Sequence, residues 1–192
     1  IATDDERIYQ VAQSFGAAVM MTSASHVSGT DRCAEVLSNL GDGIDYIVNI
    51  QGDEPLVNPL QLDQLLSAFQ EAEVLIATLG ISTVDQEDLE NPNRIKVVCD
   101  HKDNAIYFSR SVIPNHHHYK GDFLLDFPFL RHIGLYAYRT EILAHICQLM
   151  PTALEKIESL EQLRWLYHGL KIRVVQTDIE TPNIDVPEDV EK

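Results

Sequence analysis

Two acidic stretches follow predicted strands and could hold a metal ion. QGDEP follows the apolar run 44–50 and contains Asp53, whereas TPNIDVPED follows the run 172–177 and contains Asp185. In open α/β sheets ligands bind beyond the carboxyl ends of the strands, and Mg²⁺ usually takes one or two carboxylates together with substrate phosphates. The two carboxylates could therefore converge on one ion. Taken alone, a turn at Asp53 and a helix cap at Asp185 are the simpler interpretations.

Cationic and aromatic side chains also lie near predicted strand ends. Arg110 follows the strand AIYFS, and Arg131 with His132 opens the strand HIGLYAY. Arginine can clamp a carboxylate or a phosphate through two parallel hydrogen bonds, although on an acidic protein it is commonly a solvated ion-pair partner. His132 and Tyr136 are four residues apart, so a strand places both on one face. That face lines either a ligand site or the half-buried side of an edge strand.

Two predicted helix starts carry further polar groups. In SHVSGTDR the small residues Ser28 and Gly29 precede a helix from Thr30, with Arg32 in its first turn. A helix N-terminus suits an anion, but a plain capping turn explains the stretch equally simply. In SLEQLRWLYHG, Glu161 and Gln162 lie near the first turn of another helix. Glu161 is interpreted either as a helix cap or as an acceptor for sugar hydroxyls.

Helix and strand patterns alternate along most of the chain, which predicts an α/β protein with a mostly parallel sheet. A polar turn, HKDN, joins two alternating segments into a predicted hairpin, and residues 111–130 form a long excursion or a partner-facing loop. The expected helices span 6–15, 30–40, a segment that begins at Pro59, 140–150 with Thr140 as its cap, and 159–167 with Ser159 as its cap. The expected strands span 17–21, 44–50, 74–81, 95–99, 105–108, 132–138 and 172–177.

Composition restricts the class of protein. With 192 residues, 45% of them hydrophobic, the chain is expected to form one domain over residues 1–192. No run of about 18 apolar residues predicts a membrane span, and three separated cysteines favour a reducing cytoplasm over a disulfide framework. A formal net charge of −16 disfavours nucleic acid as a partner. The tract His116 to His118 is interpreted as an exposed loop because consecutive side chains cannot all face one ion.

Seven motifs occur in one order along the chain, and with them the sequence resembles the 3-deoxy-manno-octulosonate (KDO) cytidylyltransferases, or CMP-KDO synthetases. They are QGDEP, SGTDR, NPNRIKVV, YFSR, RHIGLYAYR, LEQLRWL and TPNIDVPED. The resemblance implies a three-layer nucleotide-diphospho-sugar transferase fold, which is Rossmann-like, with a hairpin and excursion used for homodimerisation. It also implies Mg²⁺-assisted transfer of CMP from CTP to KDO for lipopolysaccharide biosynthesis in a bacterial cytoplasm.

The resemblance also implies roles for individual residues. Asp53 and Asp185 correspond to the metal-binding carboxylates, and Arg110 is expected to pair with the sugar carboxylate. The KDO pocket is implied to contain Gln51, Arg110, His132, Tyr136, Glu161 and Gln162. The nucleotide side is implied to contain Thr3, Asp4, Ser28, Gly29 and Arg32.

One family motif is absent from these 192 residues. The family opens with a strand and a basic loop of the form PARxxSxRxPxKP, whereas this chain starts at Ile1 with what resembles the end of a strand. We expect that segment to precede residue 1, and a polypeptide without it to bind CTP poorly. The alternatives are a cytidylyltransferase for another acidic sugar, such as sialic or pseudaminic acid, and an inactive sugar-nucleotide-binding module.

Overall fold

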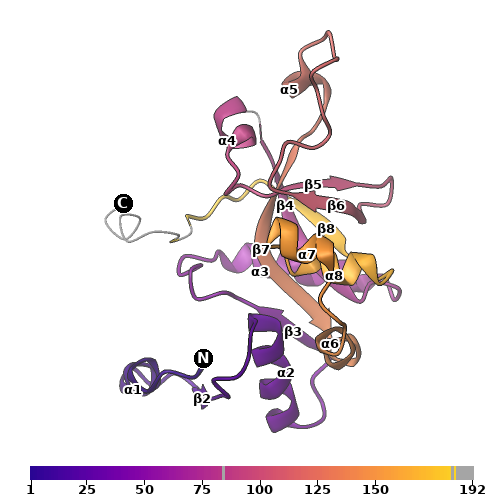
Figure 1. Ribbon diagram of the computed structural model, residues 1–192. Helices are drawn as coiled ribbons and strands as arrows, with labels where there is room; N and C mark the ends of the chain where they lie inside the picture. The colour runs from indigo at the N-terminus through magenta and orange to yellow at the C-terminus, as the bar shows by residue number, and fades with distance from the viewer. Residues whose placement is uncertain (84, 183, 185–192) are drawn as a thin grey trace.

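A six-stranded sheet forms the middle layer of the computed structural model, which describes residues 1–83, 85–182 and 184 (Figure 1). The long strand β7 (Leu130–Arg139) is its centre. One edge of β7 pairs with β4, and the other edge is shared by β3 and β5. The remaining sheet strands lie outside these pairs: β3 (Tyr46–Asn49), β4 (Ile76–Ser82), β5 (Lys96–Cys99), β6 (Ala105–Ser109) and β8 (Arg173–Thr177).

The sheet is mixed, so the prediction of a mostly parallel sheet holds only in part. β4 and β8 are parallel, but β7 runs antiparallel to β3, β4 and β5. β5 and β6 form the predicted antiparallel hairpin. The chain passes from β6 to β7 through the excursion, without a long crossover helix. Such a crossover is required only between parallel strands, so β7 can run antiparallel to its neighbours.

Helices cover both faces of the sheet, which confirms the three-layer α/β arrangement. Leu135 and Ala137 of β7 face one layer, where α3 (Pro59–Ser67) contributes Leu65 and a following 3₁₀ turn spans Ala68–Gln70. Tyr136 and Tyr138 face the other layer. That layer is built by α6 (Thr140–Cys147) and α8 (Gln162–Tyr167).

Capping chemistry sets the helix ends, and two predicted caps are wrong. Asn58 forms a capping box with Gln61 at the start of α3. Ser159 does not cap α8, because it is the left-handed residue that ends the unpredicted helix α7 (Ala153–Glu158), with φ 54°. Thr140 is the first residue of α6, and its hydroxyl donates to the carbonyl of Ile44 at 2.9 Å.

The remaining elements lie at opposite ends of the molecule in Figure 1. One end holds the two-stranded unit and its helices, and the other end holds the excursion with α5. No helix of the described part is long and apolar enough to cross a membrane. The elements at these two ends are β1 (Ala2–Thr3), α1 (Glu6–Ser14), β2 (Met20–Met21), α2 (Gly29–Leu40), α4 (Gln86–Glu90) and α5 (Phe123–Asp126).

Candidate active site

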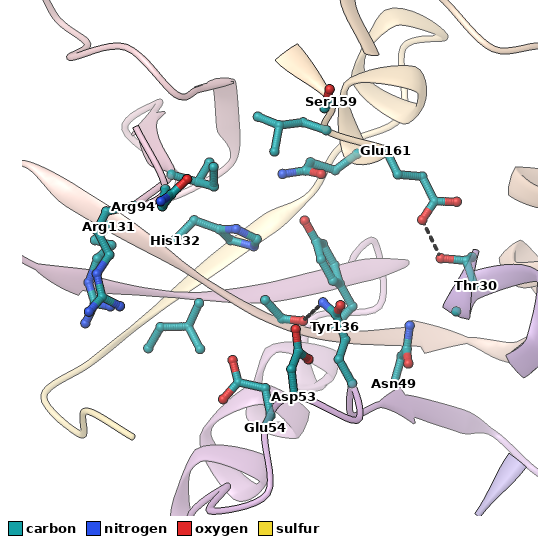
Figure 2. Close-up of a pocket in the computed structure, with 18 of the residues that line it drawn as sticks. Thr30, Asn49, Asp53, Glu54, Arg94, Arg131, His132, Tyr136, Ser159 and Glu161 are labelled. Atoms are coloured by element: carbon teal, nitrogen blue, oxygen red, sulfur yellow. Dashed lines mark hydrogen bonds between the residues drawn. The ribbon is translucent and has the colours of Figure 1, made fainter. Parts of the chain in front are cut away.

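A cavity of about 590 Å³ opens where β7 changes partners (Figure 2). β3 pairs with the second half of β7 up to Tyr136, whereas β5 pairs only with Leu130 and Arg131. The intervening stretch of β7 therefore has no strand on that edge, and the ends of β3 and β5 diverge around it. The start of α8 forms the opposite wall of the cavity. The cavity thus lies at the carboxyl ends of β3 and β6, at the amino end of β5 and along the middle of β7.

The residues assigned to the sugar side by resemblance lie around this one cavity. Its lining includes Gln51, Arg110, His132, Tyr136, Glu161 and Gln162. They come from the ends of β3 and β6, from the middle of β7 and from the start of α8. The fold thereby brings together side chains that are up to about a hundred positions apart in the chain.

The side chain of Gln51 is held against β7 by a hydrogen bond at Gly134. Its amide Nε2 donates to the carbonyl of Gly134 at 2.9 Å. A Cβ atom at position 134 would stand 2.9 Å from the same nitrogen, which is closer than a side-chain carbon can approach. Glycine at position 134 therefore lets the Gln51 amide lie against the strand, and a larger residue would displace that amide.

Glu161 accepts a hydrogen bond within the site and does not cap α8. Thr30, in the first turn of α2, donates to Glu161 Oε2 at 2.9 Å, and no side-chain cap bond is present at the start of α8. Burial raises the pKa of the Glu161 carboxyl above its ordinary value. The helix-cap interpretation of Glu161 is therefore wrong, and the contact joins two helices that lie 131 residues apart in the chain.

Two buried hydrogen-bond donors line the cavity without a well-aligned partner, although one of them, the Tyr136 hydroxyl, lies near Thr78. The Tyr136 hydroxyl and the indole Nε1 of Trp165 make no hydrogen bond of good geometry with the described residues. Both side chains are buried and both line the cavity. Buried polar groups are normally paired, so these donors are suited to a ligand. By its helical spacing Trp165 is a core residue, and periodicity does not distinguish a core residue from one that binds a ligand.

Arg110 is directed by backbone carbonyls. Its guanidinium donates to the carbonyls of Glu158 at 2.8 Å, Pro92 at 3.2 Å and Ser159 at 3.5 Å. The Glu158 carboxylate also accepts from the Arg110 backbone N–H at 2.9 Å. A guanidinium has five N–H donors, so donors remain for a bound anion.

Two other arginines line the cavity. Arg94 forms an ion pair with Asp88 at 3.1 Å, and the sequence analysis did not single Arg94 out. Arg131 is buried between Asp88 at 3.5 Å and Glu180 at 2.5 Å. Arg131 is therefore an ion-pair partner, which was the simpler of its two interpretations.

Asp53 lies in the cavity wall with an exposed side chain. The turn that follows β3 is closed by the backbone, because the N–H of Glu54 donates to the carbonyl of Gln51 at 3.1 Å. Within the described part of the chain, no side chain or backbone group pairs with the Asp53 carboxylate. The N–H of Ile184 donates to the Asp53 carbonyl at 2.8 Å, so the chain next to Asp185 reaches this turn. Asp185 itself lies outside the described residues.

The side chains around the cavity fit Mg²⁺ and not a metal that needs a full protein cage. Among residues 1–83, 85–182 and 184, no group of three or more His, Cys, Asp or Glu side chains could enclose an ion. Mg²⁺ does not need such a cage, since it keeps waters and is commonly held by one or two carboxylates and by substrate phosphates. A single uncommitted carboxylate on the cavity wall therefore fits Mg²⁺ better than zinc.

The residues assigned to the nucleotide side lie beside the cavity, and only Gly29 lines it. Ser28 caps α2 by accepting from the N–H of Asp31. Arg32 pairs with Asp4 at 3.1 Å and donates to the Thr22 hydroxyl. The Thr3 hydroxyl accepts from the N–H of Asp5 at 3.1 Å. The described residues of this side form one connected patch at the start of α2.

The burial of His132 predicts a pH dependence of stability. Desolvation lowers the pKa of the imidazole from 6.5 to about 3. Below pH 6.5 the unfolded chain takes up a proton that the folded protein excludes, so stability falls by at most about 1.4 kcal/mol per pH unit. In urea denaturation, we expect the wild type to lose about 1–2 kcal/mol more than His132→Asn between about pH 6.5 and 5. Equal losses in both proteins would contradict the shift.

Comparisons with known proteins agree with this geometry. A family model described as cytidylyltransferase matches residues 1–172, which defines the class of the protein. A 3-deoxy-manno-octulosonate cytidylyltransferase of Parabacteroides distasonis is 49% identical over 200 residues, covering 100% of this chain and 78% of the relative. The enzyme of the same name from Bacteroides thetaiotaomicron is 48% identical over 194 residues, covering 99% of this chain and 78% of the relative.

A solved structure supports the same conclusion. CMP:2-keto-3-deoxy-manno-octonic acid synthetase complexed with CTP superposes with a TM-score of 0.89 at 36% identity, covering 99% of this chain and 76% of the other. The chain belongs to the 3-deoxy-manno-octulosonate cytidylyltransferase family.

Proposed function

We propose that this protein transfers CMP from CTP to KDO and releases pyrophosphate. The observation that carries this proposal is the likeness to named KDO cytidylyltransferases along the whole chain, at 49% identity in one relative. A CTP complex with the same fold supports the nucleotide substrate. The product CMP-KDO is an activated sugar donor, and we place its use in lipopolysaccharide biosynthesis in the cytoplasm.

The cavity chemistry suits a polyhydroxylated sugar acid. Glu161 and Gln51 offer acceptors for hydroxyl groups, and the donors of Tyr136 and Trp165 offer hydrogen bonds to sugar oxygens. Arg110 retains donors for the sugar carboxylate, which a guanidinium binds in a bidentate fashion. A sugar with a carboxylate and several hydroxyl groups would satisfy all of these groups at once.

Asp53, together with Asp185, would hold Mg²⁺ next to the triphosphate. When bound, the ion neutralises charge on the phosphate oxygens. The chain's own contribution is to position the sugar, because the anomeric oxygen must lie in line with the α-phosphorus. Its bond to phosphorus then forms as the bond to the bridging oxygen of pyrophosphate breaks, and the hydroxyl proton leaves to solvent. No covalent bond to the protein is required.

We assign the nucleotide to the patch beside the cavity. The N–H groups at the start of α2, at Ser28 and Gly29, favour an anionic or carbonyl group of CTP. Thr3, Asp4 and Arg32 lie on the same patch and are assigned to the nucleotide with them. Gly29 is closely packed, since a Cβ there would stand 3.2 Å from the Asn49 amide.

We also assign the β5–β6 hairpin and the excursion of residues 111–130 to homodimerisation. The excursion projects away from the sheet in Figure 1 and exposes large apolar side chains, including Leu125 and Tyr119. His116 stacks on Phe123 with ring centroids 4.0 Å apart, so the first histidine of the tract helps to shape this segment. Exposed apolar side chains on a projecting segment are typical of a contact between subunits.

The function is tested by pyrophosphate release from purified full-length protein supplied with CTP, Mg²⁺ and one acidic sugar at a time. We expect release with KDO at least about 100-fold faster than with sialic acid, because polar groups left unpaired by the wrong sugar are costly. UTP in place of CTP is the matched nucleotide control. Release with sialic acid but not with KDO would assign the protein to another sugar, and no release with any sugar would indicate a binding module.

A further inference from the structure

The hydroxyl of Thr78 occupies an irregularity in the sheet. Thr78 of β4 pairs with Tyr136 of β7, but the next residue, Leu79, pairs with Ile133. Two residues of β7, at 134 and 135, therefore have no partner in β4. The Thr78 side chain is fully buried, with an exposed fraction of 0%, and its hydroxyl lies at this bulge.

Besides the Tyr136 hydroxyl nearby, the Thr78 hydroxyl has three hydrogen-bonding neighbours, and it has only one proton to donate. It lies 2.8 Å from the carbonyl oxygen of Leu135, 3.2 Å from that of Ile133 and 2.9 Å from Nε2 of His132. Both carbonyls are pure acceptors, so the proton must go to one of them. If it went to His132 instead, the hydroxyl oxygen would face two carbonyl oxygens without a hydrogen between them, and the buried carbonyl that accepts this proton would lose it.

This network determines the tautomer of His132. Because the hydroxyl proton is used by a carbonyl, the hydroxyl oxygen accepts, and Nε2 of His132 must carry the proton that it donates. The other ring nitrogen, Nδ1, is then an acceptor with a free lone pair. No residue of the described chain donates to Nδ1 of His132.

Aromatic contacts hold the ring in this orientation. Phe108 meets the imidazole edge to face at 5.0 Å, and the Tyr136 ring lies 5.3 Å away. Figure 2 shows the ring of His132 directed into the cavity beside Tyr136. The acceptor therefore lies within the space that a ligand would occupy.

We propose that Thr78 is a positioning residue that keeps His132 in its Nε2–H form, so that Nδ1 accepts a hydrogen bond from a hydroxyl group of the sugar. The neutral ring of His132 then recognises a hydroxyl group as a hydrogen-bond acceptor and does not pair as a cation with the sugar carboxylate. The Thr78 contact stands on the geometry alone, and the identity of the ligand rests on the proposed function. A deoxy analogue that lacks the facing hydroxyl would leave Nδ1 unpaired.

The tautomer is tested by ¹⁵N NMR of the histidine rings, with His132→Asn used to identify the signals. At neutral pH we expect a neutral ring with a proton on Nε2 in the wild type. Thr78→Ser keeps the hydroxyl and should keep this form, whereas Thr78→Val has nearly the same shape without the hydroxyl and should lose it. A proton on Nδ1, or an imidazolium, in the wild type would overturn the proposal even if the valine variant failed to fold.

Kinetics test the link to the sugar. Thr78→Val is expected to raise KM for KDO about tenfold, which corresponds to one neutral hydrogen bond, with KM for CTP unchanged. Thr78→Ser should restore KM for KDO to within about twofold of the wild type. An unchanged KM for KDO in the valine variant, despite the altered tautomer, would refute the hydrogen bond from the sugar hydroxyl to His132. Absence of turnover with KDO in the wild type would instead refute the proposed function.

Discussion

Asp53→Asn is expected to reduce Mg²⁺-dependent turnover by about 10²–10³-fold, the usual cost of removing an electrostatic contact to the transition state. The asparagine keeps the shape of the side chain but loses the negative charge that would hold the ion. The Asp53 carboxylate is exposed on the cavity wall, and the turn beneath it is closed by backbone atoms of Gln51 and Glu54. The thermal unfolding temperature should therefore change little.

Asp63→Asn is the matched control. Asp63 lies on the exposed face of α3, outside the cavity, so it undergoes the same chemical change away from the site. Pyrophosphate release should be measured for both variants across a titration of Mg²⁺. Wild-type turnover in Asp53→Asn would refute its role as a metal ligand. Asp185→Asn should behave as Asp53→Asn does, and a normal rate in that variant would leave Asp53 without its partner.

Lys96→Met is expected to destabilise the fold by about 2–4 kcal/mol and to lower kcat/KM by about 100-fold. Lys96 is the first residue of β5, between β6 and β7, with an exposed fraction of 1%, and burial lowers the pKa of its ammonium. Its three N–H donors reach three carbonyl oxygens: Asn91 at 3.0 Å, Arg94 at 2.7 Å and Arg110 at 2.6 Å. Methionine fills the space of the stem but leaves these carbonyls without their donor.

The loss of activity follows from the same contacts. Arg94 and Arg110 both line the cavity, and the ammonium of Lys96 ties their backbones together across β5 and β6. A displacement of about 1 Å in such a residue can reduce the rate by about 100-fold. Lys96 is thus a positioning residue for two cations of the site.

Lys102→Met serves as the comparison, because Lys102 lies exposed in the turn of the same hairpin. Its replacement should change the free energy of unfolding by less than about 0.5 kcal/mol and leave kinetics intact. Urea denaturation and steady-state kinetics should be carried out on both variants. If Lys96→Met were as stable and as active as Lys102→Met, the three carbonyl contacts would carry no energy, and the positioning role would be wrong.

Local patterning was sufficient for the longer helices, for most strands and for the place of the acidic turn, but not for the short helices α4, α5 and α7. Side-chain periodicity depends on residues three or four positions apart in a helix and two apart in a strand, so the alternation of helices and strands and the hairpin at HKDN could be predicted. The same reasoning placed QGDEP at the end of a strand, but the prediction that this strand is buried was wrong, because the residues of β3 are half-buried or exposed. The assignment of particular residues to a sugar pocket required the family resemblance, because no spacing reveals which loops converge.

Contacts between distant parts of the chain were decided only by the folded structure. The antiparallel course of β7, and the exchange of its partner from β3 to β5 that opens the cavity, arise from strand pairing across the chain. The Glu161 carboxylate accepts a hydrogen bond from the Thr30 hydroxyl and does not cap its own helix. Thr78 was an ordinary buried strand residue in the sequence, and its hydroxyl acquires a role only at a bulge formed with β7. Register and bulges depend on which strands meet, and this is a property of the whole chain that no local window contains.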